Sequence, residues 1–368
     1  MPSVPHPSQW SDELLRILRT AGLLDDPAWH KAFTAVPRHH FLPYFYSAMS
    51  NTWHRLDPDS VGDDAWCRLA YRDQTWVMRL SGPHSQPGHP ASSSIQPSLA
   101  VRMLNELAVT NNSHILEIGT GTGYLTALLC HRVGANNITS IDIDPELVDS
   151  AGRLLAELGY TPTLVTADAI LGYPDQAPYD RVLGTAAVDR IPDSWIDQTR
   201  PGGRIVTPLR STIAIIDVHD DHHATGRFLP IVVKVLPLRT QVRIPLAGSS
   251  CPHITSGRSV DHGSLPVRAL YDDNFRFLLD IALPGINVDE QDPLGGLVVR
   301  DADGSTAQIS PAGQARQLGP RRLCDDIATI HKIWHTAGEP GSDRYRLTID
   351  SRRHTIWLDD GREWHWVL

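Results

Sequence analysis

Residues 114–129, "HILEIGTGTGYLTALL", decide the fold. The run "HILEIG" predicts a buried strand, and "GYLTALL" begins a predicted helix. The glycines between the two runs recur at every second position: Gly119, Gly121 and Gly123. The alternation continues with a predicted strand at 137–144 and a predicted helix at 145–159. Strands that alternate with helices in this way predict a parallel sheet flanked by helices.

The spacing of these glycines restricts the ligand that the loop can hold. A dinucleotide fingerprint reads GxGxxG, and its pyrophosphate rests on the helix N-terminus. Here the glycines stand at 119, 121 and 123, with Glu117 two residues before the first. A phosphate-binding P-loop needs a lysine followed by serine or threonine, which "GTGTGYLT" lacks. Both interpretations are therefore disfavoured, and a nicotinamide oxidoreductase is kept only as an alternative.

Acidic residues stand at the ends of three successive predicted strands: Glu117, Asp142 and Asp168. Asp142, 19 residues past Gly123, is placed to accept both hydroxyls of a ribose. Asp168, in "VTADA", is placed to accept the amino proton of an adenine. S-adenosylmethionine has no pyrophosphate and needs polar partners of this kind, while glycines let the backbone approach it closely. The set favours S-adenosylmethionine over a dinucleotide, with turn-forming strand ends as the simpler alternative.

Composition and charge limit the class of protein. The 368 residues carry a formal charge of −9, which disfavours a general affinity for nucleic acid or anionic membranes. No apolar run approaches the roughly 18 residues of a membrane span, and the N-terminus lacks the pattern of a secretory signal. The four cysteines show no CxxC spacing, so neither a disulfide framework nor a metal site is predicted. A cytoplasmic enzyme is expected.

The regions on either side of the glycine loop differ in pattern. Residues 10–45 have apolar residues at helical spacing and predict a pair of helices, and the Gly-, Pro- and Ser-rich residues 82–98 predict a long loop. Near the C-terminus, Asp303-Gly304 predicts a hairpin turn. Three segments are predicted: an N-terminal helical segment at 1–80, a cofactor-binding core at 81–235 and an α+β module at 236–368.

Residues from about 12 to 235 resemble the protein-L-isoaspartate O-methyltransferase family. The matching pieces run in order: "VPRHHFLP", "SIQPSLAVRML", "ILEIGTGTGYLTALL", "SIDIDPELV", "ADAILGYPDQAPYDRVLGTAA" and "IPDSWIDQTRPGGRIVTPL". The glycine loop alone marks only some S-adenosylmethionine enzyme. The segment "DAILGYPDQAPYD", followed by "QTRPGGRIVTP", is far more specific.

The resemblance implies a Rossmann-like, seven-strand methyltransferase fold with N-terminal helices and a smaller C-terminal α+β module. It implies S-adenosylmethionine as cofactor, a peptide or protein carrying aspartate or isoaspartate as partner, and methylation of its carboxylate. The residues expected to bind the cofactor are Glu117, Gly119, Thr120, Gly121, Gly123, Asp142, Ile143, Asp168, Ala169 and Thr185. Arg38, in "VPRHH", is expected to pack rather than to catalyse.

One departure from the family pattern concerns the substrate. The family reads Thr-Ile/Val-Ser-x-Pro before the helix that follows, and its serine is taken to contact the substrate carboxylate. Counting back from Pro97 puts Ile95 at that position. Either Ser94 takes the role, with Ser93 as the next candidate, or the carboxylate is held differently.

The variant loop and the long C-terminal region also resemble a subgroup associated with ribosomally made, modified peptides. Such a likeness implies methylation of aspartate in a dedicated peptide, followed by succinimide and isoaspartate formation. The alternatives are a general isoaspartate repair enzyme, the nicotinamide oxidoreductase, and a cofactor-binding scaffold without turnover.

Overall fold

The computed structural model describes most of the chain and divides it into two compact units. The described residues are 8–49, 52–81, 88–220, 223–240, 258–260, 267–289, 296–359 and 364–368. The first unit comprises Met1–Pro208, Ile215–His222 and Val235–Gln241, and the second comprises Leu209–Ala214, His223–Lys234 and Val242–Leu368. The three segments predicted from the sequence divide the chain differently, and their boundaries at residues 80 and 235 stay a prediction.

A parallel sheet forms the centre of the first unit. Five of its strands pair in the order β9-β8-β5-β6-β7. Their bounds are β5 Ile115–Ile118, β6 Ile138–Asp142, β7 Thr163–Thr166, β8 Tyr179–Gly184 and β9 Thr199–Leu209. All four residues of β5 are buried, as expected of a strand covered on both faces. The first predicted strand and the predicted parallel sheet are thus confirmed.

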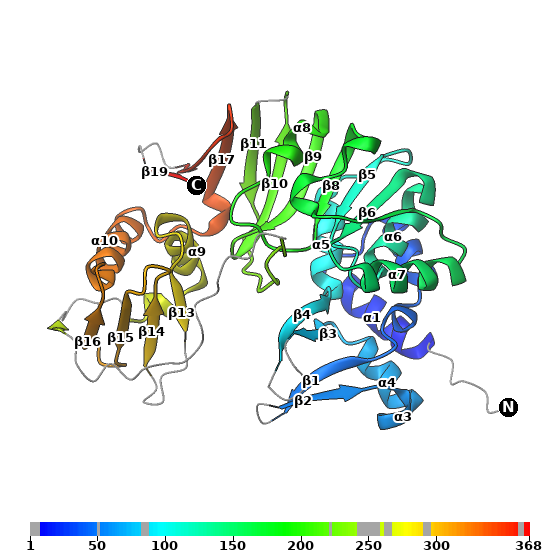
Figure 1. Ribbon diagram of the computed structural model, residues 1–368, viewed down its shortest axis with the longest axis horizontal. Coiled ribbons are helices and arrows are strands. Elements are labelled where there is room, and N and C mark those ends of the chain that lie inside the picture. Colours follow the sequence, from blue (N-terminus) through cyan, green and yellow to red (C-terminus); the bar gives the residue numbers. More distant parts are fainter. Residues whose placement is uncertain are drawn as a thin grey trace. The chain divides into compact units, whose positions relative to one another are not determined.

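Helices connect these strands and cover the sheet. Helix α6 (Tyr124–Val133) contacts β6, and α7 (Pro145–Glu157) contacts β6 and β7 (Figure 1). Gly134 ends α6, and Pro145 stands in the first turn of α7, as the sequence predicts. Helix α5 (Pro97–Leu107) contacts β8, and the short α8 (Asp193–Asp197) precedes β9. Because these strands are parallel, the carboxyl ends of β5, β6, β7 and β8 lie along one edge of the sheet.

Whether the methyltransferase sheet has the expected seven strands depends on the strands that follow β9. Strand β10 (Thr212–Val218) has residues in both units, and β11 (His223–Phe228) belongs to the second. The count of seven therefore stays a prediction.

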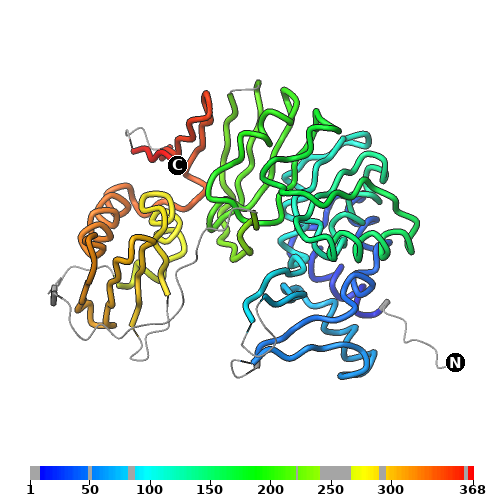
Figure 2. The backbone as a smooth tube through the Cα atoms, in the orientation of Figure 1, coloured from blue at the N-terminus to red at the C-terminus, as the bar shows by residue number. Residues whose placement is uncertain are grey.

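The N-terminal residues contain the predicted pair of helices, α1 (Ser8–Thr20) and α2 (Pro27–Ala35). Helix α2 contacts α6, and the rings of Phe33 and Tyr124 meet edge to face with their centroids 6.3 Å apart. Figure 2 shows the N-terminal helices in blue, and α2 lies beside α6, which flanks the sheet. The N-terminal segment is nevertheless not only helical.

An antiparallel sheet of four strands, in the order β2-β1-β3-β4, corrects two expectations. The strands are β1 Phe45–Met49, β2 Thr52–Leu56, β3 Trp76–Ser81 and β4 His89–Ser94, with α3 (Pro58–Val61) and α4 (Asp63–Ala70) between β2 and β3. The predicted helical segment thus contains strands, and the predicted loop at 82–98 is wrong for residues 89–94. Serine and proline are not typical of strands, but pairing with β3 orders them here.

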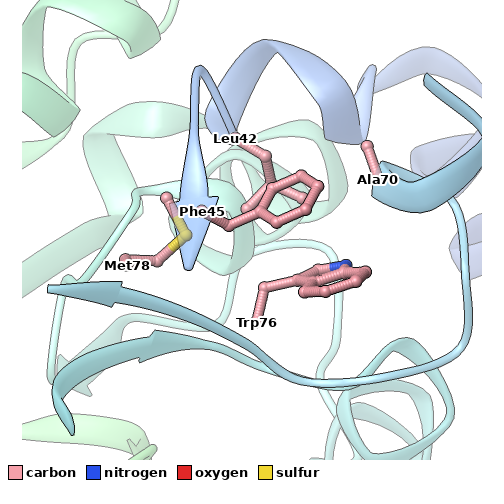
Figure 3. Packing of buried hydrophobic residues seen from close by; sticks show 5 residues of the cluster. All are labelled: Leu42, Phe45, Ala70, Trp76 and Met78. Atoms are coloured by element: carbon pink, nitrogen blue, oxygen red, sulfur yellow. The ribbon is translucent and has the colours of Figure 1, made fainter. Parts of the chain in front are cut away.

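A small apolar core holds this sheet to the preceding turn. Five buried side chains form it, as Figure 3 shows: Leu42, Phe45, Ala70, Trp76 and Met78. The rings of Phe45 and Trp76 stack at 4.1 Å between centroids, and the indole N–H of Trp76 donates to the Leu69 carbonyl at 3.1 Å. The side chain of Trp76, the first residue of β3, is therefore held at one ring face by Phe45 and at its N–H by the Leu69 carbonyl.

The second unit contains two sets of antiparallel strands. In one, β11, β17, β18 and β19 are neighbours in that order and belong to the same ten-stranded sheet as β5 to β9; the other is a separate sheet with the order β12-β16-β15-β14-β13. Bounds not yet given are β12 Arg258–Val260, β13 Asn287–Asp289, β14 Leu297–Arg300, β15 Thr306–Ile309, β16 Ala315–Leu318, β17 Tyr345–Asp350, β18 Arg353–Leu358 and β19 His365–Val367. Helices α9 (Asp273–Ala282) and α10 (Leu323–Thr336) contact each other. The predicted turn at Asp303-Gly304 joins β14 to β15, which confirms that hairpin.

The helices of the described residues include none with the length and apolar character needed to cross a membrane.

Candidate active site

The glycine loop follows the carboxyl end of β5, where Gly119 and Gly121 are half-buried and Gly123 is buried. The three glycines have φ angles of +94°, +52° and +84°, which favour glycine over residues with a side chain. A β-carbon on Gly119 would collide with the hydroxyl of Thr185, whereas one on Gly121 would meet nothing within 4 Å. The loop is fixed because Gly119 and Thr120 donate their N–H groups to the Ile141 carbonyl, at 2.7 and 3.1 Å.

Asp142, the last residue of β6, joins the loop to the next strand. Its Oδ2 accepts the N–H of Gly121 at 3.0 Å, and its Oδ1 accepts the N–H of Asp144 at 3.1 Å. The residue is 7% exposed. Two backbone groups therefore hold the carboxylate in one orientation while part of it stays accessible, which fits a site for the ribose hydroxyls.

Glu117 lies wholly inside the protein. Its Oε2 accepts hydrogen bonds from Thr126 of α6 at 2.6 Å and from Ser140 of β6 at 2.7 Å. Burial raises the pKa of this carboxyl to about 7, although the two hydroxyls oppose that shift. Thr120 also directs its hydroxyl to Ser140, at 2.7 Å. These contacts hold the base of the loop, so the expected contact of Glu117 and Thr120 with the cofactor stays a prediction.

Asp168 and Ala169 follow β7 at the same edge of the sheet. The Asp168 side chain accepts the N–H of Ile170 at 3.2 Å and so begins the short helical turn Ala169–Leu171. The carbonyl of the buried Ala169 accepts a hydrogen bond from the indole N–H of Trp195 at 2.8 Å. Asp168 itself is half-buried, and its contact with adenine stays a prediction.

The other two expected cofactor residues lie next to this edge. Thr185 follows β8 and donates its hydroxyl to the carbonyls of Ile118 and Gly119, at 2.9 and 3.0 Å. Ile143, half-buried, lies between the acids at 142 and 144. The ten predicted cofactor residues thus gather at the ends of β5, β6, β7 and β8.

The two candidate serines lie at the end of β4 and differ in environment. Ser94 is 3% exposed, and its hydroxyl oxygen accepts the Trp76 N–H at 3.2 Å and the Arg38 guanidinium at 3.4 Å. Ser93 is the register partner of Val77 and is less buried. Successive residues of a strand face opposite sides, so the two serines cannot serve the same purpose.

Arg38 has the packing role that the sequence predicts, in a specific form. Arg38 is 1% exposed. Its guanidinium donates to three backbone carbonyls, those of Arg72, Gln74 and Ile95, at 2.7, 3.0 and 3.2 Å. Burial lowers the pKa of this guanidinium to about 10, so it stays charged at neutral pH. The side chain therefore fixes the turn between β4 and α5, where the candidate serines and Ile95 lie.

Two arginines near Asp142 have no signal in the sequence. Arg79 of β3 contacts Asp144 at 2.8 Å and Glu146 at 2.6 Å. Arg239 contacts Asp142 at 3.4 Å and Asp144 at 3.5 Å. Neither "WVMRL" nor "PLRT" is a motif, and the two contacts join residues 65 and 97 positions apart.

A parallel sheet with a glycine loop after its first strand and an acid at the end of the second fits the binding of a nucleotide-like cofactor such as S-adenosylmethionine. Comparison with known proteins specifies the family. The family described as protein-L-isoaspartate(D-aspartate) O-methyltransferase matches residues 9–227, more than half of the chain. The chain belongs to this family, and it is a carboxyl O-methyltransferase that depends on S-adenosylmethionine.

Individual relatives agree with the family match. Protein-L-isoaspartate O-methyltransferase 1 of Syntrophobacter fumaroxidans is 35% identical over 148 residues, which are 40% of this chain and 68% of that protein. The protein-L-isoaspartate O-methyltransferase of Gloeobacter violaceus is 35% identical over 179 residues, 48% of this chain and 72% of that one. A solved structure of a protein-L-isoaspartate O-methyltransferase covers 95% of this chain and 99% of its own, with a TM-score of 0.54 and 20% identity. This last likeness concerns the fold alone.

The raised pKa of Glu117 gives a prediction for stability. A carboxyl whose pKa is higher in the folded than in the unfolded protein favours folding while it is protonated, and this contribution is lost as the pH rises from about 4.5 to about 7. One pKa unit corresponds to about 1.4 kcal/mol, so the loss reaches about 3 kcal/mol. Glu117→Gln removes the charge, and its free energy of unfolding relative to the wild type should therefore increase between pH 5 and pH 8.

Urea unfolding at both pH values measures this difference. Glu13→Gln, on the exposed face of α1, is the matched control and should show no such change. An equal difference between Glu117→Gln and the wild type at pH 5 and pH 8 would contradict the account of this carboxyl.

Proposed function

We propose that the enzyme methylates the free carboxylate of isoaspartyl residues in proteins without dedication to one peptide. The observation that carries this proposal is the family match over residues 9–227, together with relatives that all bear the name of protein-L-isoaspartate O-methyltransferases. The solved structure of that name also covers 95% of this chain.

A dedicated modified peptide is the second candidate, and one observation favours it. Ile95 stands where the family pattern has the serine that is taken to contact the substrate carboxylate. A changed residue at this point would suit a changed substrate. Acceptance of aspartate in a cyclised peptide, with later succinimide formation, is the activity that distinguishes this candidate.

The residues at the carboxyl edge of the sheet fit S-adenosylmethionine. Asp142 presents a fixed carboxylate for the ribose hydroxyls, Asp168 one for the adenine amino group, and the missing side chain of Gly121 leaves space beside the loop. We assign Thr185 to the wall of the site because its hydroxyl holds the end of β5. The bound cofactor supplies an electrophilic methyl group; the protein supplies the orientation of both reactants.

The accepting carboxylate needs little chemical activation. A carboxyl group is already ionised at neutral pH, so no strong general base is required. The protein has to hold one carboxylate oxygen, direct the other toward the methyl group and exclude water from around it. A hydroxyl donor at the end of β4 serves the first purpose, and Ser94 is the proposed donor, with Ser93 as the next candidate. Because Arg38 and the Trp76 N–H occupy the oxygen of Ser94, its hydroxyl proton is the part left to donate.

The substrate class is tested with two sets of peptides and S-adenosylmethionine. One set contains linear peptides with isoaspartate, and the other contains cyclised peptides with aspartate. We expect a mass gain of about 14 Da, one methyl group, across isoaspartyl peptides of unrelated sequence, and no gain on linear aspartyl controls. Methylation restricted to cyclised aspartyl peptides, followed by loss of methanol to a succinimide, would contradict general action and support the second candidate.

The role of the serines is tested by substitution. A hydrogen bond to a charged group contributes about 1.5–3 kcal/mol, so Ser94→Ala should lower kcat/KM for an isoaspartyl peptide roughly 10- to 100-fold. Ser92→Ala is the matched control, because Ser92 is also buried and faces the same side of β4. The affinity for S-adenosylhomocysteine should stay unchanged in both variants. Full activity of Ser94→Ala together with a large loss in Ser93→Ala would move the assignment to Ser93.

A further inference from the structure

Residues 235–240 run along the carboxyl edge of the parallel sheet. The Ala187 N–H donates to the Leu236 carbonyl at 2.9 Å, and the Leu238 N–H donates to the Ala187 carbonyl at 2.8 Å. Ala187 and Pro237 form a parallel bridge. This segment, which we call the strap, is therefore attached two residues beyond Thr185, at the end of β8.

The next residue of the strap reaches a different strand. Arg239 contacts Asp142 at the end of β6, at 3.4 Å. Strand β5 lies between β8 and β6 in the sheet. Leu238, one residue earlier, is bonded to Ala187 beside β8, so the side chain of Arg239 spans the distance to β6, past the end of β5 where the glycine loop begins. The arginine side chain thus lies at the edge at which the predicted cofactor residues gather.

The contact between Arg239 and Asp142 competes with the role proposed for Asp142. A carboxylate offers about four lone-pair positions. Gly121 and Asp144 occupy two of them with backbone N–H groups, and Arg239 occupies a third. A ribose diol needs two. Because the backbone donors are held by the loop and by the start of α7, the arginine is the partner that can leave.

Arg239 has the properties of a residue that can change partners. Its side chain is 40% exposed, and both of its contacts, to Asp142 and Asp144, are long. Asp144 is already paired with Arg79 at the shorter distance of 2.8 Å. A guanidinium has five N–H donors, so a released Arg239 can donate to one oxygen of the substrate carboxylate and leave the other oxygen free to face the methyl group.

A second arginine, Arg79, connects the strand pair that carries the serines to the acidic residues that Arg239 also contacts. Arg79 is the register partner of Ser92 in the β3–β4 pair, and it contacts Asp144 and Glu146 at the start of α7. The strap and the β3–β4 pair are therefore held to the same acidic turn, residues 142–146, by one arginine each. Arg79 thus links this turn to the strand pair that carries the candidate serines.

We propose that Arg239 binds the carboxylate of the isoaspartyl substrate, and that Asp142 holds it until the ribose of the cofactor takes its place. Binding is then ordered, with the cofactor before the peptide. This arrangement also supplies a charged donor that compensates for Ile95 at the family's serine position. The inference rests on the proposed function, since it concerns the carboxylate of that substrate.

The test compares Arg239→Gln and Arg239→Lys with the full-length wild type. Titration calorimetry with S-adenosylhomocysteine should give Arg239→Gln an affinity equal to or a few-fold higher than that of the wild type, because a competitor for Asp142 is gone. The KM of an isoaspartyl peptide should rise at least tenfold in Arg239→Gln with a smaller change in kcat, and Arg239→Lys should recover part of it. Arg55→Gln, which removes an exposed ion pair with Asp57, is the control and should change neither value.

The order of binding gives a readout that a merely structural role would not change. Calorimetry should show that the wild type binds the isoaspartyl peptide more tightly, by at least tenfold, when S-adenosylhomocysteine is present, and that Arg239→Gln loses most of this difference. An unchanged KM in Arg239→Gln, or a parallel loss of affinity for S-adenosylhomocysteine, would overturn the inference while wild-type turnover still supports the proposed function. A wild type that binds S-adenosylhomocysteine but methylates no isoaspartyl peptide would refute the proposed function, and the inference with it.

Discussion

The hydrogen bond from the Gly121 N–H to the Asp142 carboxylate is the contact on which the site depends. It joins the loop after β5 to the end of β6 at 3.0 Å, and a second backbone group, the Asp144 N–H, fixes the other carboxylate oxygen. Gly121 has a positive φ of +52°, which favours glycine at this point of the loop. This contact holds the glycine loop in a fixed position relative to the end of β6. The expected positions of Asp168 and Thr185 around the cofactor depend on that fixed position.

Buried charged groups hold the rest of the site around that joint. Glu117, at the base of the glycine loop, accepts hydrogen bonds from Thr126 of α6 and Ser140 of β6. Arg38 gathers three backbone carbonyls at the turn before α5. Glu117 accepts two hydroxyls on Oε2, and Arg38 donates to three carbonyls, so removal of either residue would leave its partners unsatisfied. Arg38 positions backbone, whereas Glu117 positions the side chains of Thr126 and Ser140.

The sequence predicts the parallel sheet, which the structure confirms, because the sheet has strong local signals. Apolar runs, glycines at alternate positions and acids at strand ends each have a direct physical meaning. The strand β4 has no such signal, since "HPASSS" reads as a loop until β3 is available to pair with it. Nor does alternation tell which way Glu117 points in a strand buried on both faces. The contacts of Arg79 and Arg239 depend on residues 65 and 97 positions away, beyond the reach of any local pattern.

The central claim is that the carboxylate of Asp142 binds the ribose of the cofactor, and titration calorimetry with S-adenosylhomocysteine tests it most directly. Asp142→Asn keeps the size of the side chain but removes its charge and one of its acceptor oxygens. Its affinity should fall about tenfold or more, since a hydrogen bond to a charged group contributes about 1.5–3 kcal/mol. Asp149→Asn, on the exposed face of α7, is the control and should bind as the wild type does. An unchanged affinity of a folded Asp142→Asn variant would contradict the account.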